Sequence, residues 1–447
     1  MFKTDKDVLT KEEIVKIIKE YKASDLYLNY VDNLRYYTGN NPHIMDRQTP
    51  DPNAPDNKIP VSYGRKIINT VTGYMFKAGL INYGSEDEAY LNSLTEVFDA
   101  NREPIKTEQM GKQTSTQGVG YEFHYVDGMI LDGQTKAVPK FIKLPVIETI
   151  PVYDYSIEPT LTAFIRFYMM GDEMVVFVYY KTDWIEYRKK KDGKDMVPVA
   201  AGVHPYGQVP LVVFDNNEEK LGDFDSVTPL IDAYDVLLSD SMNEFDRFAW
   251  AYLILKGFTI SPENAAAVKA MRIFELKGET DMISFLTKDI NSEFIKFMAE
   301  WIRGEIHQQS GIPNLDDTKW GGNASGETVT KFIYMMELFT DPKESYFKEG
   351  LYQRIRLITN ILEQARKPVG EPFEVDILMT RNKPDNSLEQ AMIFEKLDGR
   401  LSRKTLIENY APAVKNADDE LDRIKEEGLN LADPEFDTTP RPSDEDN

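Results

Sequence analysis

Cysteine is absent from the 447-residue sequence. Its absence excludes a disulfide framework, cysteine-based zinc sites and thiol catalysis, and it fits assembly in a reducing cytoplasm. Long hydrophobic runs are also missing. The longest, such as Val175 to Tyr180, are far too short to span a bilayer, and the N-terminal MFKTDKDVLTKEE lacks the apolar stretch of a secretory signal. We therefore expect a soluble protein without a membrane partner.

Basic residues are few compared with acidic ones. The chain has 52 Lys and Arg against 75 Asp and Glu, and its formal net charge is −23. This excess opposes tight binding of a polyanion through phosphate neutralisation, so a high-affinity DNA clamp is disfavoured. The hydrophobic share of 41% is still high enough to bury real cores, and the length suggests about three packed units.

Helical and strand patterns occupy different blocks of the chain, which predicts an α+β fold. Apolar residues at helical spacing predict helices at 12–38, 63–76, 90–101 and 226–252. Residues 120–214 instead contain short β-branched and aromatic runs separated by turns, a pattern typical of an antiparallel β domain. The hairpin signals are Asp127-Gly128, Asp132-Gly133, Gly171-Asp172 and Asp192-Gly193.

The second half combines a small insert with further helices. Residues 253–290 read as strand, helix, strand and strand, and Asn291 can cap a helix that runs to about Ser310. After a glycine-rich loop, Ser325 can cap another long helix, which Pro342 should kink because proline lacks an amide hydrogen. More helices are expected at 387–397, 402–410 and 417–428.

The helix at 226–252 has an apolar face and an acidic face. The acidic residues are Asp225, Asp232, Asp235, Asp240, Glu244 and Asp246. Three interpretations stay open for this face. Its carboxylates could bind divalent cations, it could be an ordinary solvated surface, or it could border a channel for a polyanion, where repulsion prevents sticking.

No catalytic set of nucleophile, base and orienting residue stands out. The four histidines, His43, His124, His204 and His307, are never within four residues of one another, so a helical pair of metal ligands cannot form locally. The loop from Gly321 to Gly326 lacks the Gly-Lys-Ser/Thr sequence and the preceding strand of a phosphate-binding loop. We therefore expect no catalytic residue, no metal site and no cofactor.

Four stretches, taken in order, carry a family resemblance. They are residues 57–83 (NKIPVSYGRKIINTVTGYMFKAGLINY), 204–217 (HPYGQVPLVVFDNN), 230–257 and 311–347 with its GGNASGE core. The segment LDGRLSRKTLIENYAPAVKNADDELDRIKEE is similar to the helical end region of the same family. In this combination the chain resembles the portal proteins of tailed double-stranded DNA bacteriophages, of the type found in long-tailed phages of Gram-positive bacteria.

The resemblance implies a structural role and not a catalytic one. The expected assembly is a dodecameric ring of identical subunits at one capsid vertex of the virion, put together in the cytoplasm of the bacterial host. Double-stranded DNA would pass through it without sequence specificity, inward during packaging and outward during ejection. The implied partners are the large terminase, which would hydrolyse ATP, the major capsid and scaffolding proteins, and the head-tail adaptor.

The resemblance also implies a division of the chain into parts. Residues 1–222 would form the wing, 223–252 and 291–312 the stem helices, and 253–290 the clip. The remaining parts are a tunnel loop at 313–326, a long kinked wing helix with a following strand at 327–384, a helical crown at 385–430 and a disordered acidic tail at 431–447.

Two sets of residues are candidates for contact with DNA. The polar edge of the second stem helix carries Glu293, Lys296, Glu300, Arg303 and His307 at the spacing of one helical stripe. We expect this stripe to face the channel, where charges of alternating sign give shallow contacts; surface ion pairs are the alternative. In the tunnel loop the candidates are Asp316, Asp317, Lys319, Trp320 and Asn323, with glycines that permit movement.

An enzyme is the competing hypothesis. A metal-dependent phage nuclease or hydrolase could use the acidic cluster formed by Asp225, Asp232 and Asp235. Electron microscopy of the purified protein distinguishes the two hypotheses, because uniform rings with a central hole favour the portal and a persistent monomer with magnesium-dependent DNA cleavage favours the enzyme.

Overall fold

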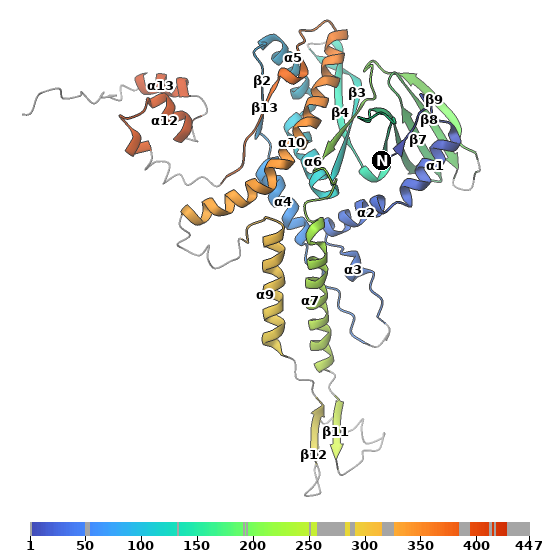
Figure 1. Ribbon diagram of the computed structural model, residues 1–447, viewed down its shortest axis with the longest axis vertical. Helices are drawn as coiled ribbons and strands as arrows, with labels where there is room; N and C mark the ends of the chain where they lie inside the picture. The colour runs from blue at the N-terminus through green and yellow to red at the C-terminus, as the bar shows by residue number, and fades with distance from the viewer. Residues whose placement is uncertain are drawn as a thin grey trace, which may run out of the picture. The chain divides into compact units, whose positions relative to one another are not determined.

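The protein is described from a computed structural model (Figure 1). The structure describes residues 2–49, 54–131, 134–190, 193, 195–249, 252–256, 282–286, 291–314, 326–383, 394–410, 414 and 417–426. The chain divides into two compact units, Met1–Asn382 and Lys383–Asn447. The mixture of helices and antiparallel strands confirms the predicted α+β class.

The chain begins with helices that are shorter than predicted. The expected single helix at 12–38 is wrong: α1 spans Lys11–Lys22 and α2 spans Asp25–Thr38. Ser24 separates them because its side chain accepts a hydrogen bond from the Tyr27 amide and so caps α2. The short α3 (Pro42–Met45) follows, and α4 (Tyr63–Met75) lies where a helix was predicted.

Two helices precede the β domain, and one of them was missed. The helix α5 (Glu88–Asn101) matches the prediction, but α6 (Glu103–Gln117) was not anticipated. The sequence of α6 is mostly polar, so it gives little apolar periodicity. Nevertheless its Thr114, Ser115 and Thr116 are buried. Their hydroxyl groups can leave water because each forms a hydrogen bond with a nearby carbonyl group or side chain.

The larger sheet has six strands and confirms the predicted β domain. Only β1 and β5 pair in parallel, and the other neighbours are antiparallel. The order is β1 (Phe2–Lys3), β5 (Thr149–Tyr153), β6 (Leu161–Met170), β7 (Glu173–Tyr179), β8 (Asp183–Lys190) and β9 (Val197–Val203). The predicted turn at Gly171-Asp172 joins β6 to β7.

Two smaller sheets complete this part of the first unit. One contains β10 (Leu211–Asp215), β3 (Val119–Leu131) and β4 (Gln134–Leu144) in that order. The predicted turn at Asp127-Gly128 is wrong, because both residues pair with β4 inside this ladder. The other sheet pairs β2 (Ile81–Gly84) with β13 (Asp376–Met379), the strand expected after the long kinked helix.

Two long helices lie side by side below the sheets in Figure 1. The first, α7, spans Thr228–Ala249, and the second, α9, spans Ser292–Gln309. Between them in sequence, β11 (Tyr252–Lys256) and β12 (Met282–Leu286) form an antiparallel pair. The expected helix after Ser261-Pro262 and the expected strand at 272–276 lie outside the described residues. Short 3-10 turns occupy Val146–Glu148, Asp225–Val227 and Pro372–Glu374.

The longest helix, α10 (Gly326–Gln364), contains Pro342 in its interior. The ribbon of α10 changes direction part-way along its length, as expected for a helix with an internal proline (Figure 1). Among the helices that the structure describes, none combines the length and the apolar character needed to cross a membrane. In the second unit, α12 (Arg403–Tyr410) and α13 (Ala417–Glu426) are described.

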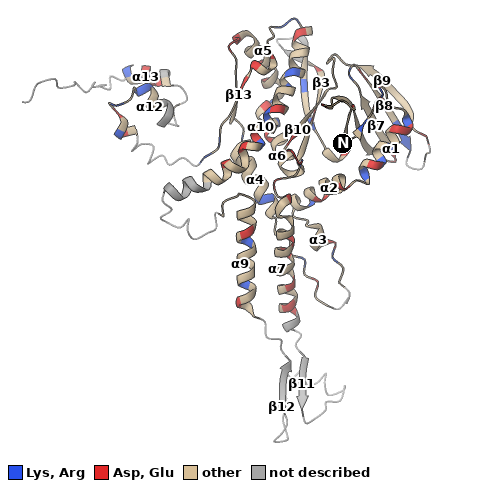
Figure 2. Ribbon diagram, in the orientation of Figure 1, with Lys and Arg blue, Asp and Glu red and all other residues tan. Residues whose placement is uncertain are grey.

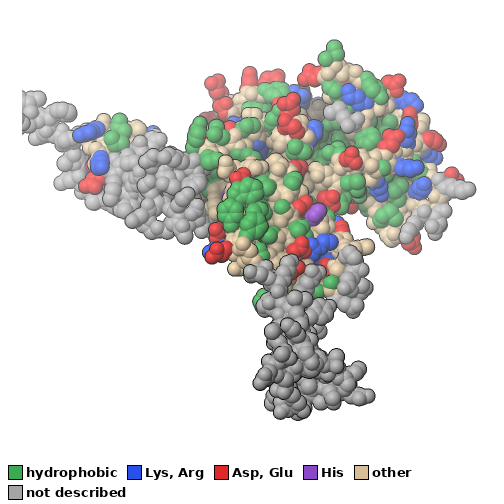
Figure 3. All heavy atoms as spheres, turned by 60° about the horizontal axis from the view of Figure 1, so that its bottom comes forward, with side chains coloured by type: hydrophobic (Ala, Val, Ile, Leu, Met, Phe, Trp, Pro, Cys, Tyr) green, Lys and Arg blue, Asp and Glu red, His purple; other side chains and the backbone are tan. Residues whose placement is uncertain are grey.

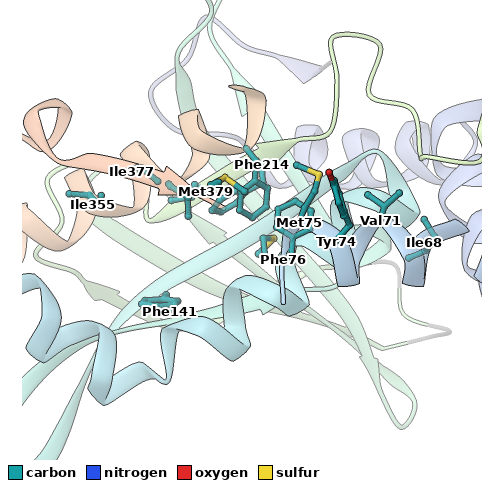
Figure 4. Packing of buried hydrophobic residues seen from close by; sticks show 14 of the residues in the cluster. Ile68, Val71, Tyr74, Met75, Phe76, Phe141, Phe214, Ile355, Ile377 and Met379 are labelled. Carbon is teal, nitrogen blue, oxygen red and sulfur yellow. The ribbon is translucent and has the colours of Figure 1, made fainter. Parts of the chain in front are cut away.

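Two hydrophobic cores hold the first unit together. One joins α4, α5, α7, α9 and α10 to the β10-β3-β4 and β2-β13 sheets, and part of it is shown in Figure 4. Phe76 and Phe347 are buried in it, with ring centroids 4.5 Å apart. The other core packs α1 against the six-stranded sheet. The helices α7 and α9 enter the first core at one end only, and many side chains of α9 stay exposed along the rest of that helix.

Candidate functional site

The point at which α9 begins determines which of its residues share the charged face, which we call the stripe. Asn291 caps α9 by accepting a hydrogen bond from the Phe294 amide at 3.0 Å, as predicted. Glu293, Lys296 and Glu300 are exposed, and Arg303 is half-buried. Lys296 Nζ lies 4.0 Å from Glu300 Oε1, an exposed pair one helical turn apart. Charges of both signs therefore lie on one face of α9, while acidic residues prevail along α7 (Figure 2).

His307 does not belong to this stripe, which corrects the prediction. Its side chain is buried, its Nδ1 lies 3.1 Å from the Ile312 carbonyl oxygen, and its ring stands edge-on to Tyr63 at 6.0 Å. The helix ends before Gly311, where φ is +66°, and the Ile312 carbonyl just beyond it reaches the imidazole. Burial inside one subunit cannot be undone by adding neighbouring subunits, so His307 cannot line a channel.

A second face of α9 is apolar and exposed. Phe294, Phe297 and Trp301 leave 58%, 61% and 50% of their surface in solvent. A third face carries Ile302 and Ile306, which are buried in the core that includes α7. At 100° per residue the three faces lie roughly 120° apart. Hydrophobic side chains gather in a patch on the side of the molecule where α9 lies (Figure 3).

The acidic face of α7 is not the open surface that the sequence suggested. Asp235 is completely buried and accepts hydrogen bonds from the Val61 amide at 2.8 Å and from Asn41 Nδ2 at 2.7 Å. Asp232 accepts from the Tyr36 hydroxyl at 2.7 Å and also from Asn41. The chain's own preceding segment thus covers this part of the helix.

The remaining acidic residues of this region also have partners within the chain. Asp225 accepts from Asn33 at 2.8 Å, from Asn29 at 3.3 Å and from the Gly222 amide at 2.9 Å. Further along α7, Asp240 pairs with Arg47 at 2.8 Å and Asp246 accepts from Asn57 at 2.6 Å. Periodicity along α7 does not reveal these donors, because most of them come from residues about 190 positions away.

Burial dominates the electrostatics of this cluster. It raises the pKa of Asp235 to about 6, and the nearby carboxylate of Asp232 adds to the rise, although the hydrogen bonds from Asn41 and Val61 oppose it. Burial likewise raises the pKa of Asp225. Protein donors therefore account for the carboxylates of Asp225, Asp232 and Asp235 without a cation. In the part of the chain that the structure describes, no three His, Cys, Asp or Glu side chains form a metal-binding group.

The tunnel-loop candidates cannot be placed. Asp316, Asp317, Lys319, Trp320 and Asn323 all lie outside the described residues.

Two buried basic residues of α10, which sequence reasoning missed, form ion pairs that fix this helix to the rest of the unit. Lys343, directly after Pro342, pairs with Asp223 at 2.7 Å and also donates to Ser115. Arg354 is fully buried, donates to both carboxylate oxygens of Glu122 at 2.8 and 2.7 Å and reaches Glu103 at 3.0 Å. Such residues show no periodic signal in a sequence, since their partners come from distant elements.

Comparison with known proteins identifies the family. The family model described as phage portal protein, SPP1 Gp6-like, matches residues 18–430, which is most of the chain. The chain belongs to this family of phage portal proteins. The predicted resemblance to phage portal proteins is thereby confirmed.

Two curated relatives agree with this assignment. The chain is 22% identical over 445 residues to the portal protein of Bacillus phage SPP1, covering 93% of this chain and 86% of that protein. It is 24% identical over 374 residues to the portal protein of Clostridium phage phiCD119, covering 79% of this chain and 81% of the relative. Each match extends over most of both proteins.

Among solved structures, the portal-family chain is similar to chains from gene transfer agent particles. A chain from the neck of a native particle computed with C12 symmetry gives a TM-score of 0.46 at 12% identity, covering 85% of this chain and 92% of that one. A chain from the neck of an empty particle computed with C6 symmetry gives 0.47 at 13% identity, with the same coverage.

Proposed function

We propose that this portal protein forms a dodecameric ring at one capsid vertex and serves as the conduit for DNA during packaging and ejection. The observation that carries the proposal is the division of α9 into three faces. One face packs into the subunit core, one is apolar and exposed, and one carries Glu293, Lys296, Glu300 and Arg303.

The exposed apolar face supports assembly into a ring. Phe294, Phe297 and Trp301 are large side chains that a monomer would leave in water, and apolar faces of this kind mark interaction surfaces. Contact between this apolar face and a different face of the next copy is heterologous, and heterologous contacts related by rotation close into rings. The core face and the apolar face are then both occupied, which leaves the charged face for the hole.

The charges suit a surface along which DNA slides. Each phosphate neutralised by Lys or Arg strengthens a sequence-independent grip, whereas carboxylates oppose it. On the stripe Glu293 and Glu300 offset Lys296 and Arg303, so the wall contacts DNA lightly and without sequence specificity. The tunnel loop at 313–326, with Lys319 and Trp320 at its tip, stands on family resemblance alone.

Portal-type assembly determines the other proposed partners and the location. The ring would bind the large terminase, which supplies ATP hydrolysis, together with the major capsid and scaffolding proteins and the head-tail adaptor. It would be built in the cytoplasm of the bacterial host and remain at the portal vertex of the virion. The protein itself acts as a structural conduit and not as an enzyme.

The packaging test compares two matched charge reversals. Lys296→Glu changes the stripe, and Lys16→Glu changes α1, where Lys16 and Glu20 form an equally exposed pair one turn apart. We expect Lys296→Glu to lower packaging efficiency or packaged DNA length while rings still form, and Lys16→Glu to leave both unchanged. Equal packaging by both variants would remove Lys296 from the channel wall, and Lys319→Ala tests the tunnel loop in the same assay.

Electron microscopy separates the conduit from the competing enzyme. Purified protein should show uniform rings with a central hole. A persistent monomer that cleaves DNA in the presence of magnesium would favour the nuclease. The nuclease hypothesis rested on Asp225, Asp232 and Asp235, and these carboxylates already accept hydrogen bonds from donors within the chain.

A further inference from the structure

A segment without helix or strand, residues 54–62, lies along the polar face of α7; we call it the strap. Alternate backbone amides of the strap donate to side chains of the helix. The Asn57 amide donates to Asn243 Oδ1 at 2.7 Å, the Ile59 amide to Ser239 Oγ at 3.0 Å and the Val61 amide to Asp235 Oδ1 at 2.8 Å.

The spacing of these bonds follows from the two backbone geometries. Every second residue of an extended chain advances by about 6.6 Å. Every fourth residue of an α-helix advances by about 6.0 Å. The strap donors at 57, 59 and 61 therefore stay in step with the acceptors at 243, 239 and 235, in antiparallel direction. Differences in side-chain length among Asn, Ser and Asp absorb the small mismatch.

Both ends of this ladder are tied by asparagine side chains. Asn57 Nδ2 donates to Asp246 Oδ2 at 2.6 Å, and Asn41 Nδ2 bridges Asp235 and Asp232 near the other end. Ser239, Asp235 and Asn243 are buried beneath the strap, although they are polar. Buried polar groups need hydrogen-bond partners, and the strap amides supply them.

We propose that the strap is a brace within the subunit. By donating to acceptor side chains at every fourth position of α7, the strap fixes the direction of that helix. Through α7 the brace also holds the position of α9, which packs beside it. The three amide bonds of the ladder run from backbone to side chain, so each can be removed by a substitution on the helix without breaking a sheet. The brace lies within a single subunit and does not depend on the proposed ring or on DNA.

Hydrogen exchange on the full-length protein tests the brace with a matched pair of serine substitutions. Ser239→Ala removes the acceptor of the Ile59 amide, whereas Ser241→Ala changes a serine whose hydroxyl bonds within α7, to Leu237. We expect Ser239→Ala to speed exchange about tenfold both in the strap and in α7 beyond residue 240, with β6 and β7 unchanged. Ser241→Ala should change neither region. Faster exchange in the strap alone would overturn the proposal, and so would equal effects of the two variants.

A disulfide provides a second test in the opposite direction. Asn57→Cys combined with Asn243→Cys places thiols where the two side chains are in contact, and the chain has no other cysteine to compete. When oxidised, this variant should exchange more slowly in α7 beyond residue 240 than when reduced. Equal exchange in the two states would show that the strap does not brace the helix. A disulfide that joins two subunits instead of closing within one would overturn the assignment as well.

Discussion

Lys343 Nζ lies 2.7 Å from Asp223 Oδ2, and both side chains are almost completely buried. This ion pair joins α10, one residue after Pro342, to the segment that leads into α7. Removing one partner of a buried pair leaves the other charge without compensation. Lys343→Ala should therefore lower the free energy of unfolding by about 3–5 kcal/mol in urea titrations. Lys348→Ala is the control, since that lysine pairs one turn away with Glu344 near the surface and should cost at most about 1 kcal/mol.

Replacing Arg354 with lysine tests how much the forked geometry of its guanidinium contributes to stability when the charge is kept. Its guanidinium donates to both oxygens of Glu122 and to Glu103, and Phe141 and Phe214 lie against it at 4.7 and 5.3 Å. A lysine has the same charge but cannot form this fork. Arg354→Lys should cost about 2 kcal/mol or more in the free energy of unfolding, within the range for charged hydrogen bonds. The exposed Arg356→Lys, two residues away, should cost far less, and equal losses would contradict the argument.

Asp235 gives the fold a pH dependence of defined sign. Its pKa is raised from its ordinary value of 3.8 to about 6, so its contribution to stability is greatest below the ordinary value and is lost as pH rises through about 6. The stability of the wild type relative to Asp235→Asn should therefore fall by about 1 kcal/mol or more between pH 5 and pH 8. Thermal unfolding of both proteins across this range measures the difference, and a gap independent of pH would contradict the assignment.

The apolar face of α9 should matter for assembly and not for folding. Phe297 and Trp301 are exposed in the subunit, so Phe297→Ala and Trp301→Ala should leave the unfolding midpoint of the subunit nearly unchanged. In the ring, each truncation should cost about 2 kcal/mol or more per interface, as buried aromatic anchors do. Size-exclusion chromatography with light scattering should show smaller species. Ile157→Ala, a fully exposed residue outside the stem, should assemble normally.

The parts of the fold that could be predicted are those with local signals. Asn291 as a helix cap, the helices around 63–75 and 88–101, and the turn at Gly171-Asp172 follow from capping residues, periodicity and turn chemistry. The helix α6 was not predicted because most of its buried residues are polar, chiefly Thr, Ser and Gln, so the sequence shows little apolar periodicity there. The split between α1 and α2 could not be predicted from periodicity, because the apolar pattern does not show the cap that Ser24 forms on the Tyr27 amide.

The candidate site could be predicted only as a set of helix faces. Spacing placed Glu293, Lys296 and Glu300 on one side of α9, and the structure puts all three at the surface. Spacing could not show that the turn after α9 buries His307, nor that Asn41 and Val61 cover Asp235. These contacts join residues that are far apart in the chain or follow a turn, and periodicity within one helix carries no information about them.

In the proposed ring, the charged stripe of α9 faces the hole and the apolar face contacts the next copy. Cryo-electron microscopy of the assembled, purified protein would show both faces at once. We expect Glu293, Lys296 and Glu300 to line the central channel and Phe297 and Trp301 to be buried between subunits. A ring in which the aromatic side chains face the channel, or in which the charged stripe lies on the outer wall, would contradict it.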